Sequence, residues 1–157
     1  MPVGIYSNAA ASYAMNNRKN RKRGKPAGSP AYWALLDVLH FDEQGLIPAV
    51  IQDVRSKRVL TLCYLNREAL ERTLREGKVY VFRRSQSRVM LKGETSGHIQ
   101  LIKEVRVDCE GKSLLLAVQQ RVAACHAGYV SCYFRIIGRD GLVTMGRRVF
   151  DPKAVYR

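Results

Sequence analysis

The sequence predicts an α+β fold, made mostly of antiparallel strands with one central helix. Three observations indicate it: apolar stretches of strand length alternate with short polar links, one segment has helical periodicity between capping residues, and no internal repeat or heptad occurs. The chain has 157 residues, 46% of them hydrophobic, which suffices for one domain with a core. No apolar run reaches the ~18–20 residues of a membrane span.

Short apolar segments bounded by polar or glycine-containing links are expected to form the strands. The polar link 53–58 is short enough for a hairpin between the first two strands. The glycines at 138 and 141 indicate a further hairpin near the carboxyl end. The expected strands are 47–52, 59–64, 79–82, 89–91, 99–107, 114–118, 133–137 and 142–145.

The central helix is expected over 67–76. Asn66 is a favourable N-cap, and Gly77 is a favourable stop. Between them, Ala69, Leu70, Thr73 and Leu74 form a stripe that would face the core. A short amphipathic turn is expected at 35–39.

Positive charge is concentrated before the folded part. Lys and Arg number 27 against 13 Asp and Glu, a net charge of +14, and residues 1–36 contain no acid. We therefore expect a basic, disordered arm at 1–32 and a folded domain at 33–157. Such an arm would contact nucleic acid non-specifically at most. The arm lacks the apolar stretch of a secretory signal, which favours the cytoplasm, although basic leaders also target organelles.

Three cysteines follow one another in the second half of the domain. Cys109, Cys125 and Cys132 have fifteen and then six residues between them. Three thiolates with an open fourth position are typical of catalytic zinc, and buried apolar cysteines are the alternative. Cys63 lies in the middle of an expected strand and is assigned to the core.

Acids and a histidine flank these cysteines. On a strand, Asp108 and Glu110 would share one face and could hold magnesium, or could simply be a solvated strand end. Lys112 would lie on the same face. His126 follows Cys125 and could ligate metal, act as a base or satisfy a backbone carbonyl.

The segment Lys92–Gly97 is a turn rich in glycine, hydroxyls and backbone donors. Arg83, Arg84 and Arg88 lie just upstream, and the combination suits a phosphate group. An ordinary hairpin turn is the alternative. The candidate phosphate-binding residues are Arg84, Lys92, Gly93, Glu94, Thr95, Ser96 and Gly97.

These segments together resemble the phosphoribosyl-AMP cyclohydrolase family, from about Leu35 to the carboxyl end. The resemblance implies hydrolysis of 1-(5-phosphoribosyl)-AMP at the N1–C6 bond of the adenine ring, the third step of histidine biosynthesis. The matching blocks are Gly45–Asp53, Leu65–Leu70, Lys92–Gly97, Asp108-Cys109, and Ala124-Cys125-His126 through Ser131–Arg135.

The resemblance also implies an intertwined homodimer with zinc sites between its subunits. One subunit would supply Cys109, and the other Cys125 and Cys132. Acids flanking Cys109 would hold magnesium, and the zinc would supply a hydroxide near neutral pH. His126 would carry protons, and the Lys92–Gly97 turn with its nearby arginines would bind phosphate.

Several residues depart from the family pattern. Glu110 and Lys112 stand where aspartates usually do, and Met90 replaces an aromatic residue. Arg83-Arg84-Ser85-Gln86 replaces Ser-Arg-Ser-Arg, and Ala127-Gly128-Tyr129 replaces Thr-Gly-Arg. Lys112 is hypothesised to pair with one of the two acids and to take the place of the ion's charge; the alternative is that it turns into solvent.

These departures keep two other functions open. One is a divergent paralogue that acts on a related purine nucleotide. The other is a non-catalytic, zinc-stabilised protein that binds nucleotides or nucleic acid.

Overall fold

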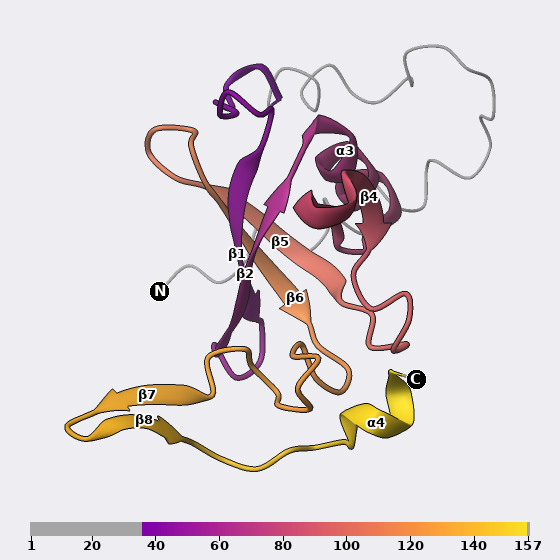
Figure 1. Cartoon of the computed structure of the whole chain (residues 1–157). Coiled ribbons are helices and arrows are strands. Elements are labelled where there is room, and N and C mark those ends of the chain that lie inside the picture. Colours follow the sequence, from indigo (N-terminus) through magenta and orange to yellow (C-terminus); the bar gives the residue numbers. More distant parts are fainter. Residues whose placement is uncertain (1–35, 157) are drawn as a thin grey trace.

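A four-stranded sheet forms the centre of the computed structural model, which describes residues 36–156 (Figure 1). Its strands are β1 (Ile47–Asp53), β2 (Val59–Leu65), β5 (Leu101–Val107) and β6 (Leu114–Gln119), in the order β2-β1-β6-β5. The arm expected at 1–32 lies outside the described residues.

The predicted α+β class is confirmed, and the sheet is mixed. The pairs β1–β2 and β5–β6 are antiparallel, as expected for hairpins. β1 and β6, however, run parallel, with Ala49 opposite Leu114. This pairing is allowed because the chain leaves the sheet after β2 and returns to it through β5.

The central helix α3 (Arg67–Glu76) has the predicted bounds. Asn66 accepts a 2.8 Å hydrogen bond from the Ala69 amide, and Gly77 ends the helix with a φ of +65°. The buried side chains of the helix are Ala69, Leu70 and Thr73.

The core lies between this helix and the sheet. Ile47, Ala49 and Ile51 of β1 are fully buried and alternate with partly exposed residues. Leu116 and Val118 of β6 are also fully buried.

Two small hairpins complete the described chain. β3 (Tyr80–Arg83) pairs with β4 (Arg88–Leu91) across the short 3₁₀ helix η1 (Arg84–Gln86). β7 (Arg135–Gly138) pairs with β8 (Gly141–Thr144) and extends away from the central sheet (Figure 1). The short helix α4 (Pro152–Val155) follows. No helix within residues 36–156 is long and apolar enough to cross a membrane.

The expectation of a strand through Asp108, Glu110 and Lys112 is wrong. β5 ends at Val107, and 108–113 form a tight turn in which Gly111 has a φ of +70°. The Asp108 carboxylate closes this turn by accepting hydrogen bonds from the Lys112 amide, 2.7 Å, and the Ser113 hydroxyl, 2.9 Å. A carboxylate that satisfies nearby donors in this way favours a turn over an extended strand.

Candidate functional site

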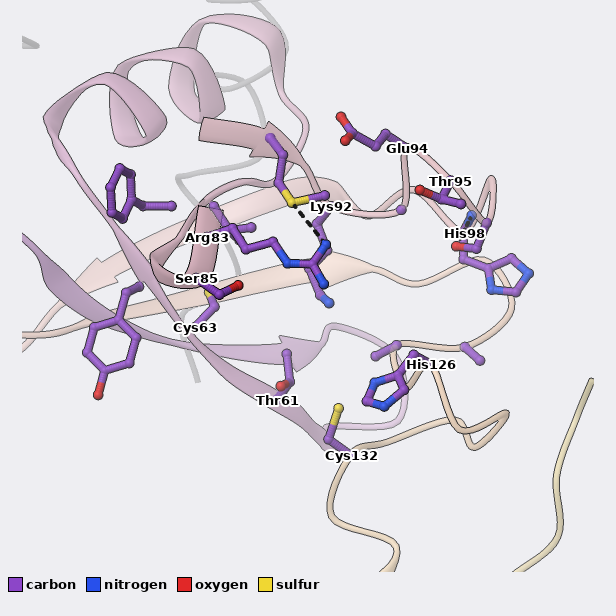
Figure 2. Close-up of a pocket in the computed structure, with 18 of the residues that line it drawn as sticks. Thr61, Cys63, Arg83, Ser85, Lys92, Glu94, Thr95, His98, His126 and Cys132 are labelled. Atoms are coloured by element: carbon purple, nitrogen blue, oxygen red, sulfur yellow. Dashed lines mark hydrogen bonds between the residues drawn. The ribbon is translucent and has the colours of Figure 1, made fainter. Parts of the chain in front are cut away.

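A cavity of about 760 Å³ lies between β2, the β3–β4 hairpin and the loops that follow β4 and β6 (Figure 2). Its volume is in the range of small-molecule sites. The side chains of Thr61 and Cys63 line it from β2, two positions apart and therefore on one face of the strand.

Cys132 reaches the cavity because its loop is fastened to the start of β2. The Cys132 amide donates a 2.8 Å hydrogen bond to the Leu60 carbonyl. The buried Ser131 hydroxyl donates to the Val59 carbonyl over 2.7 Å and accepts from the Tyr133 amide. Hydrogen bonds at Ser131, Cys132 and Tyr133 thus fix the path of the backbone that carries the Cys132 thiol.

Cys125 and Cys132 are neighbours. Burial raises the pKa of the Cys132 thiol, and the adjacent Cys125 thiol raises it further; a hydrogen bond with Thr61 and the positive charge of Lys92 act in the opposite direction. The Ala127 amide donates to the Cys125 sulfur over 3.4 Å. These two predicted zinc ligands are therefore brought together by one chain.

Cys109 is not brought to them. It is exposed in the 108–113 turn, at the opposite end of the six-residue strand β6 from Cys125 and Cys132. A strand of that length spans about 20 Å. Among the residues that the structure describes, no group of three His, Cys, Asp or Glu side chains within one chain could hold a metal ion.

Cys63 packs against the core, as expected, and also borders the cavity. Burial raises the pKa of its thiol to about 12, although the Lys92 ammonium lowers it in part. Its sulfur lies 3.5 Å from the Ala49 carbonyl oxygen. Cys63 is therefore a neutral thiol in the cavity wall.

The candidate catalytic residue His126 lines the cavity, and its imidazole lies near the Cys132 thiol (Figure 2). His98 lines the same cavity and contacts the Phe150 ring edge-on, with ring centroids 4.8 Å apart. An imidazole can both accept and donate a proton.

The predicted phosphate-binding turn forms another wall of the cavity. Lys92, Gly93, Glu94, Thr95 and Ser96 all line it, and the Gly97 amide closes the turn by donating to the Gly93 carbonyl over 2.8 Å. A Cβ at position 93 would lie 2.5 Å from the His98 carbonyl oxygen. Only glycine fits there, which fixes the path of the turn.

Comparison with known proteins matches residues 61–134 to the family model described as phosphoribosyl-AMP cyclohydrolase. The chain is 48% identical over 122 residues to a phosphoribosyl-AMP cyclohydrolase of Pelotomaculum thermopropionicum, covering 77% of this chain and 95% of that protein. The chain belongs to the phosphoribosyl-AMP cyclohydrolase family. The family resemblance found in the sequence is thereby confirmed, and the family is one of hydrolases.

Other relatives have similar coverage. The phosphoribosyl-AMP cyclohydrolase of Methanosarcina acetivorans is 48% identical over 121 residues, which are 77% of this chain and 98% of that protein. A histidine biosynthesis bifunctional protein of Thermoanaerobacter pseudethanolicus is 44% identical over 122 residues, 78% of this chain but 56% of that longer protein.

Arg83 and Arg84 line this cyclohydrolase-family cavity, Arg88 binds a residue of its lining, and the three side chains make different contacts. Arg84, one of the candidate phosphate ligands, stacks over the Tyr64 ring at 4.2 Å. Arg88 forms a 3.1 Å ion pair with Glu94. The Arg83 guanidinium contacts the Met90 sulfur at 3.9 Å.

The turn that carries Cys109 holds a local ion pair. The Lys112 ammonium lies 3.1 Å from the Glu110 carboxylate, and both side chains are exposed. Lys112 thus pairs with one of the two acids, as hypothesised, and the pairing arises from the turn rather than from a shared strand face. That its charge takes the place of an ion stays a prediction.

Thr61 and His98 line the cavity but were not assigned to it from the sequence, whereas Arg83 was among the arginines expected to bind phosphate beside the Lys92–Gly97 turn. The alternation along the expected strand 59–64 placed Thr61 on the same face as Cys63, but Cys63 was itself assigned to the core, so the pattern did not mark Thr61 as a site residue. His98 directly follows the assigned Lys92–Gly97 turn, but no motif separated it from ordinary surface residues.

Proposed function

We propose that this chain opens the adenine ring of 1-(5-phosphoribosyl)-AMP by hydrolysis at N1–C6, the third step of histidine biosynthesis. The single observation that carries the proposal is the meeting of Cys132, His126 and the Lys92–Ser96 turn in one cavity. Membership of the cyclohydrolase family supplies the substrate class.

The reaction needs a water nucleophile and two proton movements. The water oxygen bonds to C6, the C6–N1 bond breaks, and N1 receives a proton while the water oxygen loses one. His126 is the side chain best suited to carry these protons, because an imidazole can accept one from water and return one to N1. His98 lies in the same cavity and is the second imidazole available.

The cavity walls would orient the nucleotide. The Gly93–Ser96 turn offers backbone N–H groups and two hydroxyls, which suits a phosphate group. The charge of Lys92 lowers the pKa of the Cys63 and Cys132 thiols, so its ammonium lies on the side of the cavity that carries these thiols. There it would stabilise negative charge that develops during attack.

The residues fit a zinc ion shared between two subunits. Cys125 and Cys132 offer two neighbouring sulfur donors, and the exposed Cys109 is free to approach a second copy. When bound, zinc lowers the pKa of a water molecule to roughly 7 and so supplies a nucleophile at neutral pH.

A homodimer follows from the same argument, because the three cysteines lie at opposite ends of β6. A second observation supports it: the β7–β8 hairpin exposes apolar side chains, with Ile137 90% and Leu142 63% exposed. Apolar residues that the chain does not bury indicate a protein interface. We propose that a second copy of this chain covers the hairpin.

Magnesium does not fit the 108–113 turn. Both carboxylate oxygens of Asp108 accept hydrogen bonds within the turn, and Glu110 is neutralised by Lys112. Magnesium dehydrates reluctantly and demands near-ideal octahedral geometry. No role for magnesium is therefore assigned to this chain.

A related purine nucleotide is the second candidate substrate. Arg83 and Met90, which depart from the family pattern, both line the cavity and contact each other, and this observation favours a related purine nucleotide.

The test of both candidates is turnover of purified protein with 1-(5-phosphoribosyl)-AMP, followed by ultraviolet absorbance as the ring opens. Turnover supports the first candidate. A zinc-loaded protein that is silent with this substrate but active with another purine nucleotide supports the second, and inactivity with both contradicts an enzymatic function.

A further inference from the structure

We propose that Arg83 is a specificity-determining residue that binds a phosphate group of the substrate from the β3 wall of the cavity. The inference rests on the proposed function and adds to it a residue for which the family pattern has serine. Arg83 is the last residue of β3 and lines the cavity.

The surroundings of Arg83 leave its donors free. Its Nη1 contacts the Met90 sulfur at 3.9 Å across the β3–β4 hairpin, and the guanidinium extends into the cavity near Lys92 (Figure 2). A thioether is a weak acceptor, so this contact positions the guanidinium without satisfying it. No carboxylate among residues 36–156 lies within ion-pair distance of Arg83.

The two neighbouring arginines differ in this respect. Arg84 stacks over the Tyr64 ring, and Arg88 is bound to Glu94 at 3.1 Å. Arg83 is therefore the arginine of this group that is best prepared to take an anion without first breaking another strong contact. Its planar fork of N–H donors matches two phosphate oxygens.

The proposed substrate carries two phosphate groups, one on each of its ribose units. One turn can bind only one of them, so a second set of donors is needed elsewhere in the cavity. The Gly93–Ser96 turn and Arg83 belong to different walls, the loop after β4 and the end of β3. Two separate sets of donors suit a ligand that carries two anionic groups.

Kinetics of Arg83→Ser test the proposal. Loss of a charge-assisted phosphate contact should raise KM about 10- to 100-fold while kcat changes little. Arg83→Lys keeps the charge and should recover part of the loss, which a merely structural role would not predict. The dependence of KM on salt concentration should weaken in Arg83→Ser. The exposed Arg55 lies outside the cavity lining, and Arg55→Ser is the matched control, expected to leave KM unchanged.

Calorimetric binding of AMP separates failure of this inference from failure of the proposed function. If the native protein does not turn over phosphoribosyl-AMP but Arg83→Ser weakens AMP or inorganic phosphate binding about tenfold or more, the inference stands and the proposed function falls. Native turnover with KM and AMP affinity unchanged in Arg83→Ser overturns the inference alone. A native protein that neither turns over the substrate nor binds AMP or phosphate overturns both.

Discussion

The central sheet buries its own apolar side chains, whereas the chain after β6 leaves many of its own exposed. Ile47, Ile51 and Leu116 are fully buried by neighbouring strands and α3. In the β7–β8 hairpin every residue of β8 is exposed. The sheet therefore buries its apolar side chains within one chain. The segment that carries Cys125, Cys132 and the hairpin does not, and we propose that a zinc ion and a second subunit complete it. We expect variants in the two regions to behave differently.

The largest difference should separate two cysteines. Cys125→Ser removes a proposed zinc ligand from the second region and should lose most bound zinc, with activity falling more than about 100-fold. Cys63→Ser changes a neutral thiol of the sheet and should keep its zinc. Elemental analysis of both purified variants measures this, and equal loss in the two would contradict the assignment of ligands.

Dimerisation should depend on the hairpin and not on the sheet. Ile137→Lys places a charge in the proposed interface and should weaken association by about 2 kcal/mol or more, roughly 30-fold. Leu62→Lys is the matched control, because Leu62 is an exposed apolar residue of β2. Sedimentation velocity distinguishes them. A native protein that stays monomeric with zinc bound would refute the dimer.

Folding stability should depend on the sheet and not on the hairpin. Leu116→Ala leaves a cavity in the core and should lower the free energy of unfolding by about 2–5 kcal/mol. Leu142→Ala removes an exposed side chain of β8 and should change it by less than about 0.5 kcal/mol. Urea denaturation at a protein concentration below dimer formation provides the comparison, and similar losses would show that the hairpin packs within its own chain.

One substitution in the 108–113 turn, which precedes β6, should create a magnesium site. The native protein should give no saturable heat on magnesium titration, because Lys112 neutralises Glu110. Lys112→Asp reverses a charge in the 108–113 turn and should produce saturable magnesium binding, which the native protein lacks. Lys103→Asp makes the same charge change at an exposed position of β5 and serves as control. Tight magnesium binding by the native protein would disprove the interpretation of the turn.

The smallest expected effect is a pH-dependent change in the free energy of unfolding, caused by Glu76 at the end of α3. Burial raises the pKa of Glu76, but hydrogen bonds from Tyr80 and Arg75 and the charge of Arg72 outweigh it, so the pKa is below its ordinary value. Because the folded-state pKa is the lower one, the stabilisation is present above the unfolded pKa and is lost as pH falls through the folded pKa. Glu76→Gln should cost about 1 kcal/mol at pH ~7 and little at pH ~2.

Denaturation of both proteins across that pH range measures the Glu76 difference. Glu68→Gln is the control, because Glu68 forms only a 3.9 Å exposed ion pair with Arg72. A cost for Glu76→Gln that does not vary with pH would show that its packing and not its charge matters.

The sequence predicted best those features that neighbouring residues determine. Asn66 and Gly77 set the ends of α3 because capping involves only the adjacent turn. The 108–113 turn was mistaken for a strand. Whether this segment turns or stays extended depends on whether the Asp108 carboxylate accepts a hydrogen bond from a nearby backbone amide, here that of Lys112. The parallel pairing of β1 with β6 was missed because the residues near β1 in the sequence do not determine which distant strand pairs with it.

For the site as well, the sequence predicted what local motifs determine and missed what depends on packing between distant segments. Cys132, His126 and the Lys92–Ser96 turn were assigned from motifs and do line one cavity. Thr61 was not assigned, because its role depends on which loops pack against β2.

The parallel pairing of β1 with β6 also bears on how the chain is made. β1 and β2 leave the ribosome early and can form a hairpin, but Ala49 finds its partner Leu114 only after β6 has been synthesised. Pairing between residues so distant in sequence is slow to form. Until then, one edge of β1 has unpaired backbone groups and apolar side chains that other nascent chains can meet. A translational pause before Gln119 should therefore favour aggregation, and chaperone demand should be greatest in that interval.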